Sequence, residues 1–600
     1  MELKWLALVL VVLSLGAGLC DGCLEEERSA LFQLKPFFEF INYKFQPNNF
    51  KLNPKKESSS NCCEWERVEC NPITGRVTHL FLNYSAYNKM DWYLNASLFL
   101  PFEELQNLSL IGNSIAGCVV NQGFERLSLK LDKLENLDLS ENYFNDSILA
   151  SLSELSSLKS LNLAYNIFTG SNPTNESNNN WMNLKELYLG GNEINSLGSL
   201  FHGKEGMKLN KLEVLSLYDN LFNNSIFPSL AVLSNLKSLD LSYNQLEGAI
   251  YTKDLNALSN LEDLILSGNE VNGFIPSQGI RLMNLKVVDL SRNDFNNSIM
   301  SSLATLSNLK TLWIDIYQCN GLIDMKDFYG FGNLEELNMA CNLDAVCSFS
   351  LQSLGLFRTL KTLSLQGFNI NETTMPSYSH NASVTAEFTS LKRLELSYCK
   401  VNKNLSRQEG LNLRSLEELE LYESSLPSNF IQVFGPLISL KNLTAHGIDG
   451  NNTPPMNDFC ELINLQELDI NGNNLRGSLP MCFSNLTSLK KLSLSYNQLF
   501  ENISVLKNLT LLESLDLSSN QFSGNIFALK SLTLLESLDL SSNQFSESIS
   551  ALKSLTLLES LDLSSNQFSG NISALKSLTL LESLDLSSNQ FSGNISPLRA

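Results

Sequence analysis

One twelve-residue block recurs near the end of the chain at a constant spacing. It reads Leu-Glu-Ser-Leu-Asp-Leu-Ser-Ser-Asn-Gln-Phe-Ser, and its copies begin at residues 512, 535, 558 and 581, a period of 23 residues. The core of the block, Leu-x-x-Leu-x-Leu-x-x-Asn, also occurs upstream at 134–142, 158–166, 184–192, 212–220, 236–244 and 261–269. A fixed period of this size predicts a solenoid, in which each repeat packs against its two neighbours.

The letters of the block indicate what each residue does in such a repeat. The alternation around Asp516 places the two flanking leucines on one side of a short strand and the carboxylate on the other. The amide of Asn520 can donate and accept, so we expect it to satisfy backbone groups where the chain bends after the strand. At the back of the repeats, aromatic side chains are expected to stack on one another: Phe522, Phe545 and Phe568.

This core motif is the signature of leucine-rich repeats. We therefore predict an α/β repeat solenoid, a right-handed leucine-rich-repeat superhelix with a concave parallel β-sheet and irregular or 3₁₀ segments behind it. From residue 79 to residue 600 we expect about twenty-one repeats.

Composition narrows the class of partner. Apolar residues make up 43 % of the chain, which is enough for a continuous core, and the formal net charge is −21. This negative charge argues against nucleic acid or an anionic membrane surface as a binding partner, and it favours a basic peptide, protein or polysaccharide-associated partner. Acidity also keeps a long solenoid soluble, which is the more common reason for it.

The N-terminus resembles a secretory signal peptide, predicted to span residues 1–22. Lys4 precedes an apolar run from Trp5 to Leu19 that is too short to span a membrane. Cleavage after Gly18 and cleavage after Gly22 both fit, and no later stretch is apolar enough for a membrane anchor. Asn-x-Ser/Thr sequons agree with secretion and are candidate glycosylation sites. They are Asn83, Asn95, Asn107, Asn145, Asn175, Asn223, Asn296, Asn371, Asn381, Asn404, Asn442, Asn451, Asn485, Asn502, Asn508, Asn571 and Asn594.

Residues 23–78 differ from the repeats and are predicted to cap the solenoid, whose end would otherwise expose core leucines. Helical periodicity extends from Glu25 to Phe40, and residues 44–60 are predicted to be a loop. The Cys62-Cys63 pair, Trp65, Cys70 and the segment Thr74-Gly75-Arg76-Val77 follow. Together with Cys23 they resemble the N-terminal cap of plant leucine-rich-repeat receptor-like proteins and receptor kinases. The resemblance implies the disulfides Cys23–Cys62 and Cys63–Cys70, although the sequence alone does not fix connectivity.

A further cysteine pair, Cys460 and Cys482, lies one repeat apart and resembles receptor-like proteins in particular. Apart from Cys20, which lies in the predicted signal peptide, five cysteines remain: Cys118, Cys319, Cys341, Cys347 and Cys399. Since five is an odd number, at least one must be unpaired within the chain. We expect Cys399 to be a buried thiol and Cys319–Cys341 to be a possible bridge.

The repeat pattern loosens between Leu309 and Ile448, which indicates either a functional insert or sequence drift. Residues other than asparagine occupy the asparagine position there, and most should weaken the asparagine ladder. They are Tyr317, Phe368, Cys399, Ser424 and Ile448. The exposed strand positions of this region also carry aromatic and charged side chains instead of Ser, Asp or Asn, as Tyr188 and Tyr218 do earlier. Such side chains dominate interface energies. The candidate ligand-binding residues are Trp313, Asp315, Tyr317, Arg393, Glu395, Glu420, Tyr422 and His446.

No catalytic motif, metal-ligand spacing or phosphate-binding loop is found, so we expect no enzyme activity, no cofactor and no metal. The resemblance implies an extracellular receptor that binds a peptide, protein or cell-wall-derived ligand and signals through a partner receptor kinase, in defence or development. Its membrane attachment would need a C-terminal anchor absent from these 600 residues. The alternatives are a secreted leucine-rich-repeat inhibitor of cell-wall-degrading enzymes and a truncated gene product. No C-terminal cap follows the last block, and we expect residues 558–600 to self-associate.

Overall fold

The computed structural model describes residues 23–38, 61–84, 92–170, 181–197, 209–275, 282–323, 328, 330–342, 346–349, 358–370, 390–401, 413–434, 437–448 and 455–592. The chain divides into two compact units, Met1–Arg292 and Asn293–Ala600. This division was not predicted, because the leucine motif continues across it. The predicted signal peptide, the loop after the first helix and the sequons Asn175, Asn371, Asn381, Asn404, Asn451 and Asn594 lie outside the described residues.

The first unit holds the N-terminal segment and the first strands of the large sheet. Its main-sheet strands are β1 (Val68–Cys70), β2 (Val77–Phe81), β4 (Asn107–Ser109), β6 (Asn136–Asp138), β7 (Ser160–Asn162), β8 (Glu186–Tyr188), β9 (Val214–Ser216), β10 (Ser238–Asp240), β12 (Asp263–Ile265) and β14 (Val287–Leu290). Short strands form a second row: β3 (Trp92–Leu94) with β5 (Ile115–Cys118), and β11 (Glu247–Tyr251) with β13 (Glu270–Ile275). The helices are α2 (Glu25–Phe38), η1 (Cys62–Glu64), η2 (Ala96–Phe99), η3 (Phe124–Leu129), η4 (Asp146–Ile148), α3 (Leu149–Leu152), α5 (Ile226–Leu230) and α6 (Thr252–Leu255).

The second unit repeats the arrangement. Its main-sheet strands are β15 (Thr311–Ile316), β17 (Glu336–Cys341), β19 (Thr362–Gln366), β21 (Arg393–Ser397), β23 (Glu418–Tyr422), β24 (Asn442–His446), β25 (Glu467–Asp469), β27 (Lys491–Ser493), β29 (Ser514–Asp516), β31 (Ser537–Asp539), β33 (Ser560–Asp562) and β35 (Ser583–Asp585). The second row holds β16 (Asn320–Leu322), β18 (Val346–Phe349), β20 (Asn369–Ile370), β22 (Lys400–Val401), β26 (Arg476–Gly477), β28 (Gln498–Glu501), β30 (Gln521–Gly524), β32 (Gln544–Glu547), β34 (Gln567–Asn571) and β36 (Gln590–Ser592). The helices are α7 (Ile299–Leu303), α8 (Phe430–Val433), η7 (Met456–Glu461), η8 (Met481–Asn485), η9 (Ser504–Asn508), η10 (Phe527–Ser531), η11 (Ile549–Ser554) and η12 (Ile572–Ser577).

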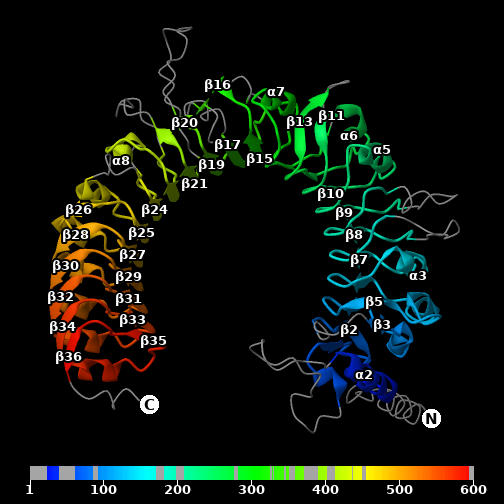
Figure 1. The fold of residues 1–600 in the computed structure, drawn as a ribbon, viewed down its shortest axis with the longest axis horizontal. Helices are drawn as coiled ribbons and strands as arrows, with labels where there is room; N and C mark the ends of the chain where they lie inside the picture. Colours follow the sequence, from blue (N-terminus) through cyan, green and yellow to red (C-terminus); the bar gives the residue numbers. More distant parts are fainter. Residues whose placement is uncertain are drawn as a thin grey trace, which may run out of the picture. The chain divides into compact units, whose positions relative to one another are not determined.

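Within each unit the main-sheet strands lie on one side of the repeats and the helical segments on the other (Figure 1). Apart from the antiparallel pair β1–β2, neighbouring main-sheet strands within each unit are parallel. The motif leucines fill the space between the two sides; Leu512, Leu515 and Leu517, for example, are at most 1 % exposed. The predicted leucine-rich-repeat solenoid with a parallel sheet is confirmed.

The asparagine of each regular repeat closes the turn after the strand. The Nδ2 of Asn520 donates to the backbone oxygens of Leu494, Leu517 and Ser518 at 2.8, 3.2 and 3.1 Å. Its Oδ1 accepts from the amide of Leu499 at 3.0 Å. One buried side chain therefore satisfies groups of its own repeat and of the preceding repeat, as expected from its donor and acceptor capacity.

The predicted aromatic stack is present behind the last repeats. Phe522 and Phe545 are 6.2 Å apart between ring centroids, and Phe545 and Phe568 are 6.0 Å apart. The stack continues to Phe591 at 6.2 Å, with nearly parallel rings. Because each ring packs on its copy in the next repeat, the stack adds lateral contact to the strand pairing.

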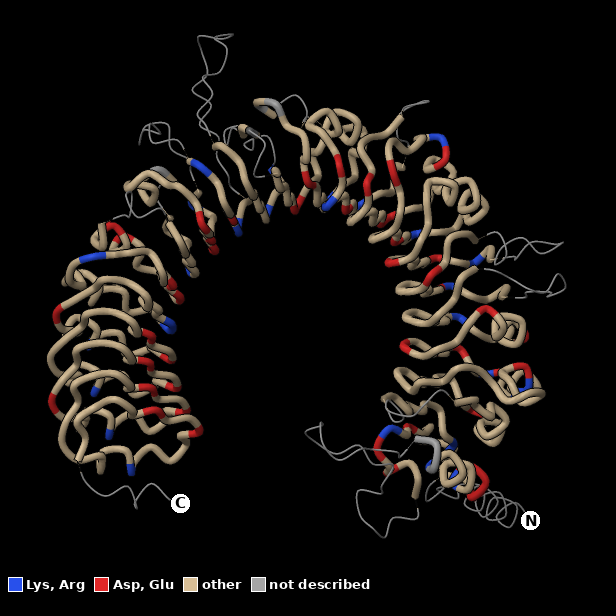
Figure 2. The backbone as a smooth tube through the Cα atoms, viewed as in Figure 1, with Lys and Arg blue, Asp and Glu red and all other residues tan. Residues whose placement is uncertain are grey.

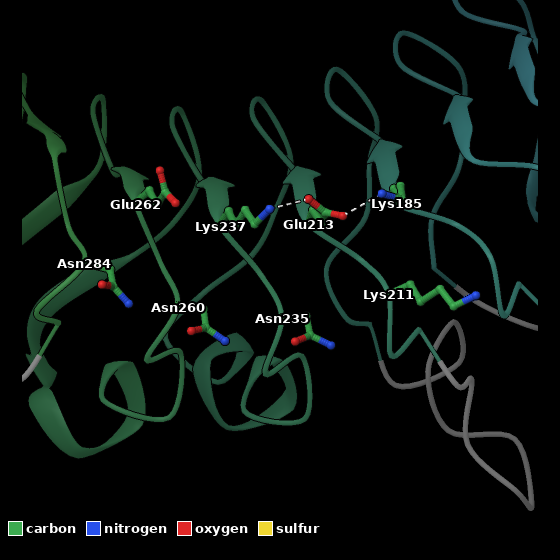
Figure 3. A pocket seen from close by; sticks show the side chains of 8 residues that line it. All are labelled: Lys185, Lys211, Glu213, Asn235, Lys237, Asn260, Glu262 and Asn284. Carbon is green, nitrogen blue, oxygen red and sulfur yellow. Dashed lines mark hydrogen bonds and ion pairs between the residues drawn. The ribbon is translucent and has the colours of Figure 1, made fainter.

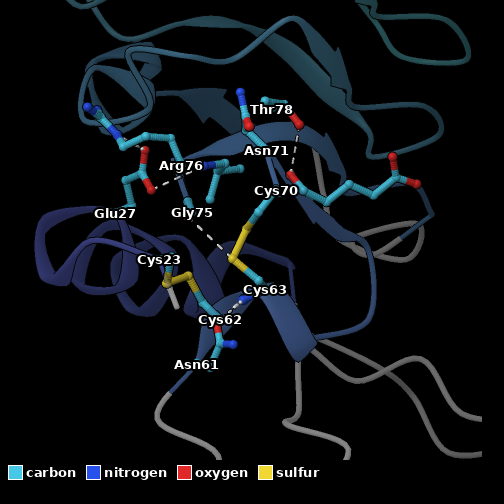
Figure 4. Close-up of a disulfide and its surroundings, with 12 residues drawn as sticks. Cys23, Glu27, Asn61, Cys62, Cys63, Cys70, Asn71, Gly75, Arg76 and Thr78 are labelled. Carbon is cyan, nitrogen blue, oxygen red and sulfur yellow. Dashed lines mark hydrogen bonds and ion pairs between the residues drawn. A yellow bond between two sulfur atoms is a disulfide. The ribbon is translucent and has the colours of Figure 1, made fainter. Parts of the chain in front are cut away.

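The segment from α2 to β2 is tied by two disulfides, Cys23–Cys62 and Cys63–Cys70, the pairs that the resemblance implied (Figure 4). A buried ion pair joins the same elements. Glu27 on α2 is fully buried, accepts from Arg76 Nε at 2.8 Å, and accepts from the Val77 amide at 3.2 Å. Since β2 pairs with both β1 and β4, these contacts attach the helix to the first repeat.

The cysteine pairing differs from expectation at one place. Cys460–Cys482 is present, but Cys341 pairs with Cys347, so the pairing Cys319–Cys341 is wrong. The chain returns after β17 through β18, which brings the Cα of Cys347 to 6.4 Å from the Cα of Cys341. Cys319 and Cys399 are buried thiols, and Cys118 is a half-buried one. Burial raises the pKa of the Cys399 thiol to about 11 and that of the Cys118 thiol to about 12, so neither is a reactive thiolate at neutral pH.

Candidate ligand-binding surface

Six strands in the first half of the second unit are longer than their neighbours. The strands β15 and β17 have six residues, and β19, β21, β23 and β24 have five, whereas β25 and β27 have three. This is the region where the asparagine is mostly replaced. The backbone still turns through a left-handed residue before the replaced position, at Gly367, Tyr398, Glu423 and Gly447. The open face of the sheet is therefore broader here, and more side chains stand on it.

Two of the replacements take over part of the work of asparagine. The hydroxyl of Ser424 contacts the backbone oxygen of Leu396 at 3.1 Å and accepts from the amide of Cys399 at 3.0 Å. The thiol of Cys399 donates to the oxygen of Leu365 at 3.3 Å. Some of the hydrogen bonds of the asparagine ladder are therefore kept at these two positions.

A connected polar cluster spans β21 to β25. Arg393 lies 3.0 Å from Glu420, 3.5 Å from Glu418 and 4.0 Å from Glu395. The hydroxyl of Tyr422 donates to Glu420 at 3.2 Å. One guanidinium therefore holds the carboxylates of two neighbouring strands, and the tyrosine is oriented by one of them.

His446 extends this cluster to the next strand. Its ring packs edge-to-face on Tyr422, with centroids 5.6 Å apart, and its Nε2 lies 3.1 Å from Asp469 Oδ1, an ion pair when the imidazole is protonated. Burial, followed by the charge and hydrogen bond of Glu420, raises the pKa of the Tyr422 phenol. Tyr422 therefore remains protonated and can donate at neutral pH.

The remaining candidates lie together on β15 and directly after it. The indole Nε1 of Trp313 donates to Glu336 at 2.9 Å. Trp313 is 36 % exposed. Tyr317 is 51 % exposed and Asp315 is half-buried. Strands β17 and β19, with Asn338, Ser364 and other small or polar residues, separate this group from the Arg393 cluster. The predicted patch is thus two groups on the face of one unit.

Sequence reasoning missed the acidic partners that hold these side chains. Glu336, Glu418 and Asp469 occupy strand positions whose usual residues are polar, so their identity gave no signal. The strand register identifies Glu418 directly, because it is opposite Arg393. Glu336 and Asp469 are opposite Thr311 and Thr444, two residues before Trp313 and His446, so their contacts are diagonal.

The early tyrosines Tyr188 and Tyr218 lie on the first unit. Tyr218 meets Tyr165 edge-to-face at 5.7 Å between centroids. A side chain at Gly190 or Gly191 would collide with these rings, since an added Cβ would lie 2.1 Å from Tyr218 and 2.4 Å from Tyr165. Burial, followed by hydrogen bonding to Tyr165, raises the pKa of Tyr218. The two rings thus meet across the intervening repeat, where Gly190 and Gly191 have no side chain that would collide with them.

A row of lysines and glutamates follows the first leucine of successive motifs, along one flank of the sheet. Glu213 contacts Lys185 at 2.9 Å and Lys237 at 2.6 Å (Figure 3). Glu335 and Glu417 are likewise each bridged by two lysines. These bonds lower the pKa of each of the three glutamates to about 2. In the first unit the row borders a groove of about 510 Å³ that is also lined by Asn235, Asn260 and Asn284.

This row predicts a defined pH dependence. A carboxyl with a lowered folded-state pKa contributes stability that is present above the unfolded pKa of about 4.5 and is lost as the pH falls toward 2. We expect the triple variant Glu213→Gln/Glu335→Gln/Glu417→Gln to melt below the native protein at pH 7 and together with it near pH 2. Thermal melts across this range test the prediction, with Glu536→Gln, which has no lysine beside it in the row, as control. A constant difference at every pH would contradict it.

The described residues contain no group of three or more His, Cys, Asp or Glu that could hold a metal ion. In the same residues we find no helix both long and apolar enough to cross a membrane. Among the sequons, Asn442 opens β24, next to the Arg393 cluster, whereas Asn95, Asn145 and Asn571 are N-caps of short 3₁₀ helices.

Comparison with known proteins agrees with the repeat architecture. Three family models match: "Leucine Rich repeats (2 copies)" at 463–508, "Leucine Rich repeat" at 232–250 and 281–304, and "Leucine Rich Repeat" at 133–155, 511–532, 534–555, 557–578 and 580–598.

The chain is 32 % identical to Cuscuta receptor 1 of Solanum lycopersicum over 505 residues, which cover 83 % of this chain and 37 % of that protein. It is 33 % identical to receptor-like protein 13 of Arabidopsis thaliana over 243 residues, 39 % of this chain and 22 % of that protein. The matched region thus spans well under half of either relative.

Among solved structures, the chain resembles the Arabidopsis receptor kinase HAESA in complex with the peptide hormone IDA and the co-receptor SERK1. The identity is 26 %, the coverage is 96 % of both chains, and the TM-score is 0.43. The motifs, the folded repeats and the family models agree: this chain is built of leucine-rich repeats, and it is similar in sequence to plant receptor-like proteins.

Proposed function

We propose that the chain is the ligand-recognition region of an extracellular plant receptor-like protein. Residues 1–22 direct its secretion, residues 23–78 cap the repeats, and residues 79–600 form the recognition surface. The receptor binds a peptide, protein or cell-wall-derived ligand and signals through a partner receptor kinase. The observation that carries the proposal is the broadened face of β15–β24, where Trp, Arg, Tyr and His stand, whereas the later strands β29, β31 and β33 carry only Ser and Asp beside their buried leucine.

Two physical features suit this face to binding. Trp, Tyr and Arg are the residues that most often anchor interfaces, and here Trp313, Tyr422 and Arg393 are each held by a carboxylate. Side chains already fixed by hydrogen bonds lose little conformational entropy when a ligand binds. The ligand would contact Trp313 at one end and the Arg393 cluster at the other.

We expect Trp313→Ala, and the pair Glu420→Ala/Tyr422→Ala, each to weaken ligand binding by ~1 kcal/mol or more. The melting temperature should hardly change, because these side chains stand on the open face and leave the leucine core intact. The test is capture from plant apoplastic fluid on immobilised protein, followed by mass spectrometry of the retained species.

Tyr496→Ala is the control, since Tyr496 is 70 % exposed and lies on a turn outside the face. Support requires a species that the native chain and Tyr496→Ala retain and that both Trp313→Ala and the double variant Glu420→Ala/Tyr422→Ala lose. Equal retention by all variants would show that the face is not the binding surface.

A further inference from the structure

The lysine–glutamate row changes in composition in the last repeats, where the lysines disappear. Upstream, lysine and glutamate recur along the row and form ion pairs, as in Lys286–Glu262 at 2.5 Å and Lys490–Glu513 at 3.2 Å. The next three residues of the row are all glutamate: Glu536, Glu559 and Glu582. Within the described residues no lysine or arginine forms an ion pair with any of the three. Successive strands of a sheet are only about 4.8 Å apart, so this part of the row is self-repelling.

A second row, two residues earlier in each repeat, changes at the same place. Upstream it is polar, mostly asparagine or serine. The Nδ2 of an asparagine there donates to a backbone oxygen of the preceding turn, as Asn260 does to Ser234 at 2.8 Å and Asn284 to Ser259 at 3.1 Å. In the last four repeats the same position is leucine. These leucines are exposed: Leu511 by 45 %, Leu534 by 39 %, Leu557 by 39 % and Leu580 by 50 %.

The two rows lie side by side. In the first unit the equivalent residues, Asn235, Lys237, Asn260 and Glu262, line one groove (Figure 3). In the last repeats, Leu534 and Glu536 are both exposed, while Leu535 between them is buried. We call the surface formed by Leu511, Leu534, Leu557 and Leu580 with the neighbouring glutamates the leucine–glutamate flank. Acidic residues also recur on these strands, as Figure 2 shows. The lysines of the same repeats, such as Lys530, belong to 3₁₀ helices and form no described ion pair with the row.

We infer that the leucine–glutamate flank is a docking surface for a cationic amphipathic helix of a partner protein, a second site beyond the ligand face of the proposed function. A lysine- or arginine-rich partner neutralises the glutamates, and its apolar face covers the leucines. The repeat spacing of about 4.8 Å favours a helix, since apolar residues three or four apart on a helix rise 4.5–6.0 Å. In an extended segment, residues on the same side are about 6.7 Å apart, which matches the leucines less well.

Charge decides against two other occupants. A second copy of this chain would bring its own glutamate row, and an anionic membrane surface would add further negative charge. Both would increase the repulsion that a cationic helix removes.

The chain itself supplies a folding-compatible variant for the test. Leu534→Asn and Leu557→Asn restore the asparagine of the upstream repeats, and Glu536→Lys places a lysine between two glutamates, as Lys237 lies between Glu213 and Glu262. This triple variant, which we call the restored-flank variant, should melt no lower than the native protein. Glu270→Lys, on β13 of the first unit, makes the same change in net charge away from the flank.

The probe is a fluorescein-labelled synthetic 18-residue helix of leucine and lysine, compared with leucine–glutamate and serine–lysine helices, and anisotropy reports binding. We expect the leucine–lysine helix to bind the native chain and Glu270→Lys at least about tenfold more tightly than the restored-flank variant. The other two helices should bind more weakly than the leucine–lysine helix.

Three outcomes would overturn the inference. The first is equal affinity for the restored-flank variant. The second is equal affinity of the serine–lysine helix, because binding would then reflect bulk charge alone. The third is a native-chain dimer, seen by light scattering, that the restored-flank variant abolishes, because the flank would then be covered by a second copy.

Discussion

We expect Asn543→Ala to lower the free energy of unfolding by about 3 kcal/mol, since each buried backbone group left unpaired costs about 1–3 kcal/mol. The Nδ2 of Asn543 donates to the oxygens of Leu517, Leu540 and Ser541 at 2.8, 3.2 and 3.1 Å. Its Oδ1 accepts from the amide of Phe522 at 3.0 Å. Alanine removes all four bonds inside a buried turn. Urea denaturation followed by circular dichroism measures the loss.

Asn543→Ser supplies the matched comparison, because the protein already uses serine at this position in another repeat. Ser424 keeps a donor to the preceding repeat and an acceptor for a backbone amide. We therefore expect the serine variant to lie between the native protein and Asn543→Ala. Hydrogen exchange at the amide of Phe522 should rise for both variants, since Ser424 accepts from the amide of Cys399, at the asparagine position of the preceding repeat, and not from the amide two residues later. A serine variant as unstable as the alanine variant would mean that the lost bonds are not the cause.

The second large effect concerns the ion pair that attaches α2 to the first repeat. Arg76→Ala leaves the buried carboxylate of Glu27 with backbone amide donors only, those of Val77 and Leu24. Removing one partner of a buried pair costs about 3–5 kcal/mol, and we expect about 3 kcal/mol here because one of the two partners is partly exposed. Chemical denaturation of Arg76→Ala is the measurement. Arg28→Ala is the control, since the Arg28–Glu25 pair is exposed and worth at most about 1 kcal/mol.

The pH dependence of this effect follows from Glu27. Burial raises its pKa above the ordinary value, and the hydrogen bond and charge of Arg76 act in the opposite direction. A raised folded-state pKa gives stability that is fully present below the unfolded pKa of about 4.5 and is lost as the pH rises through the folded value. Without Arg76 the carboxyl is easier to protonate, so Arg76→Ala should cost less at pH 5 than at pH 7. An equal cost at both pH values would place the effect elsewhere than in the buried carboxylate.

Local periodicity predicted the parts of the fold that one repeat can determine. Leu515 and Leu517 are buried, Asn520 forms hydrogen bonds with the backbone of the turn, and Phe522 stacks on Phe545, all as their spacing indicated. Glu27 could not be singled out, since it is one of three consecutive glutamates and only its contact with Arg76, 49 residues later, distinguishes it. The disulfide Cys341–Cys347 depends in the same way on the return of the chain through β18, which the degenerate motif does not encode.

For the candidate surface, the sequence predicted which side chains stand on the open face but not how they are held. The exposed positions of β21 and β23 follow from period-two alternation. The pairing of Arg393 with Glu418 and Glu420 depends on the register of strands 25 or more residues apart along the chain. The gap between Trp313 and the Arg393 cluster has the same origin, because the number of intervening strands fixes it.

The near-identity of the final blocks makes the length of the array adjustable in whole units. If residues 535–557 were excised, Leu534 would be followed by Leu558, the same pair of residues as Leu534 and Leu535 now. Phe522 would then stack on Phe568, and its amide would bond to Asn566, as the amide of Phe545 does at 3.0 Å. Slippage during DNA replication could thus lengthen or shorten this protein without creating an unfamiliar junction. Natural populations are the place to search for such length variants.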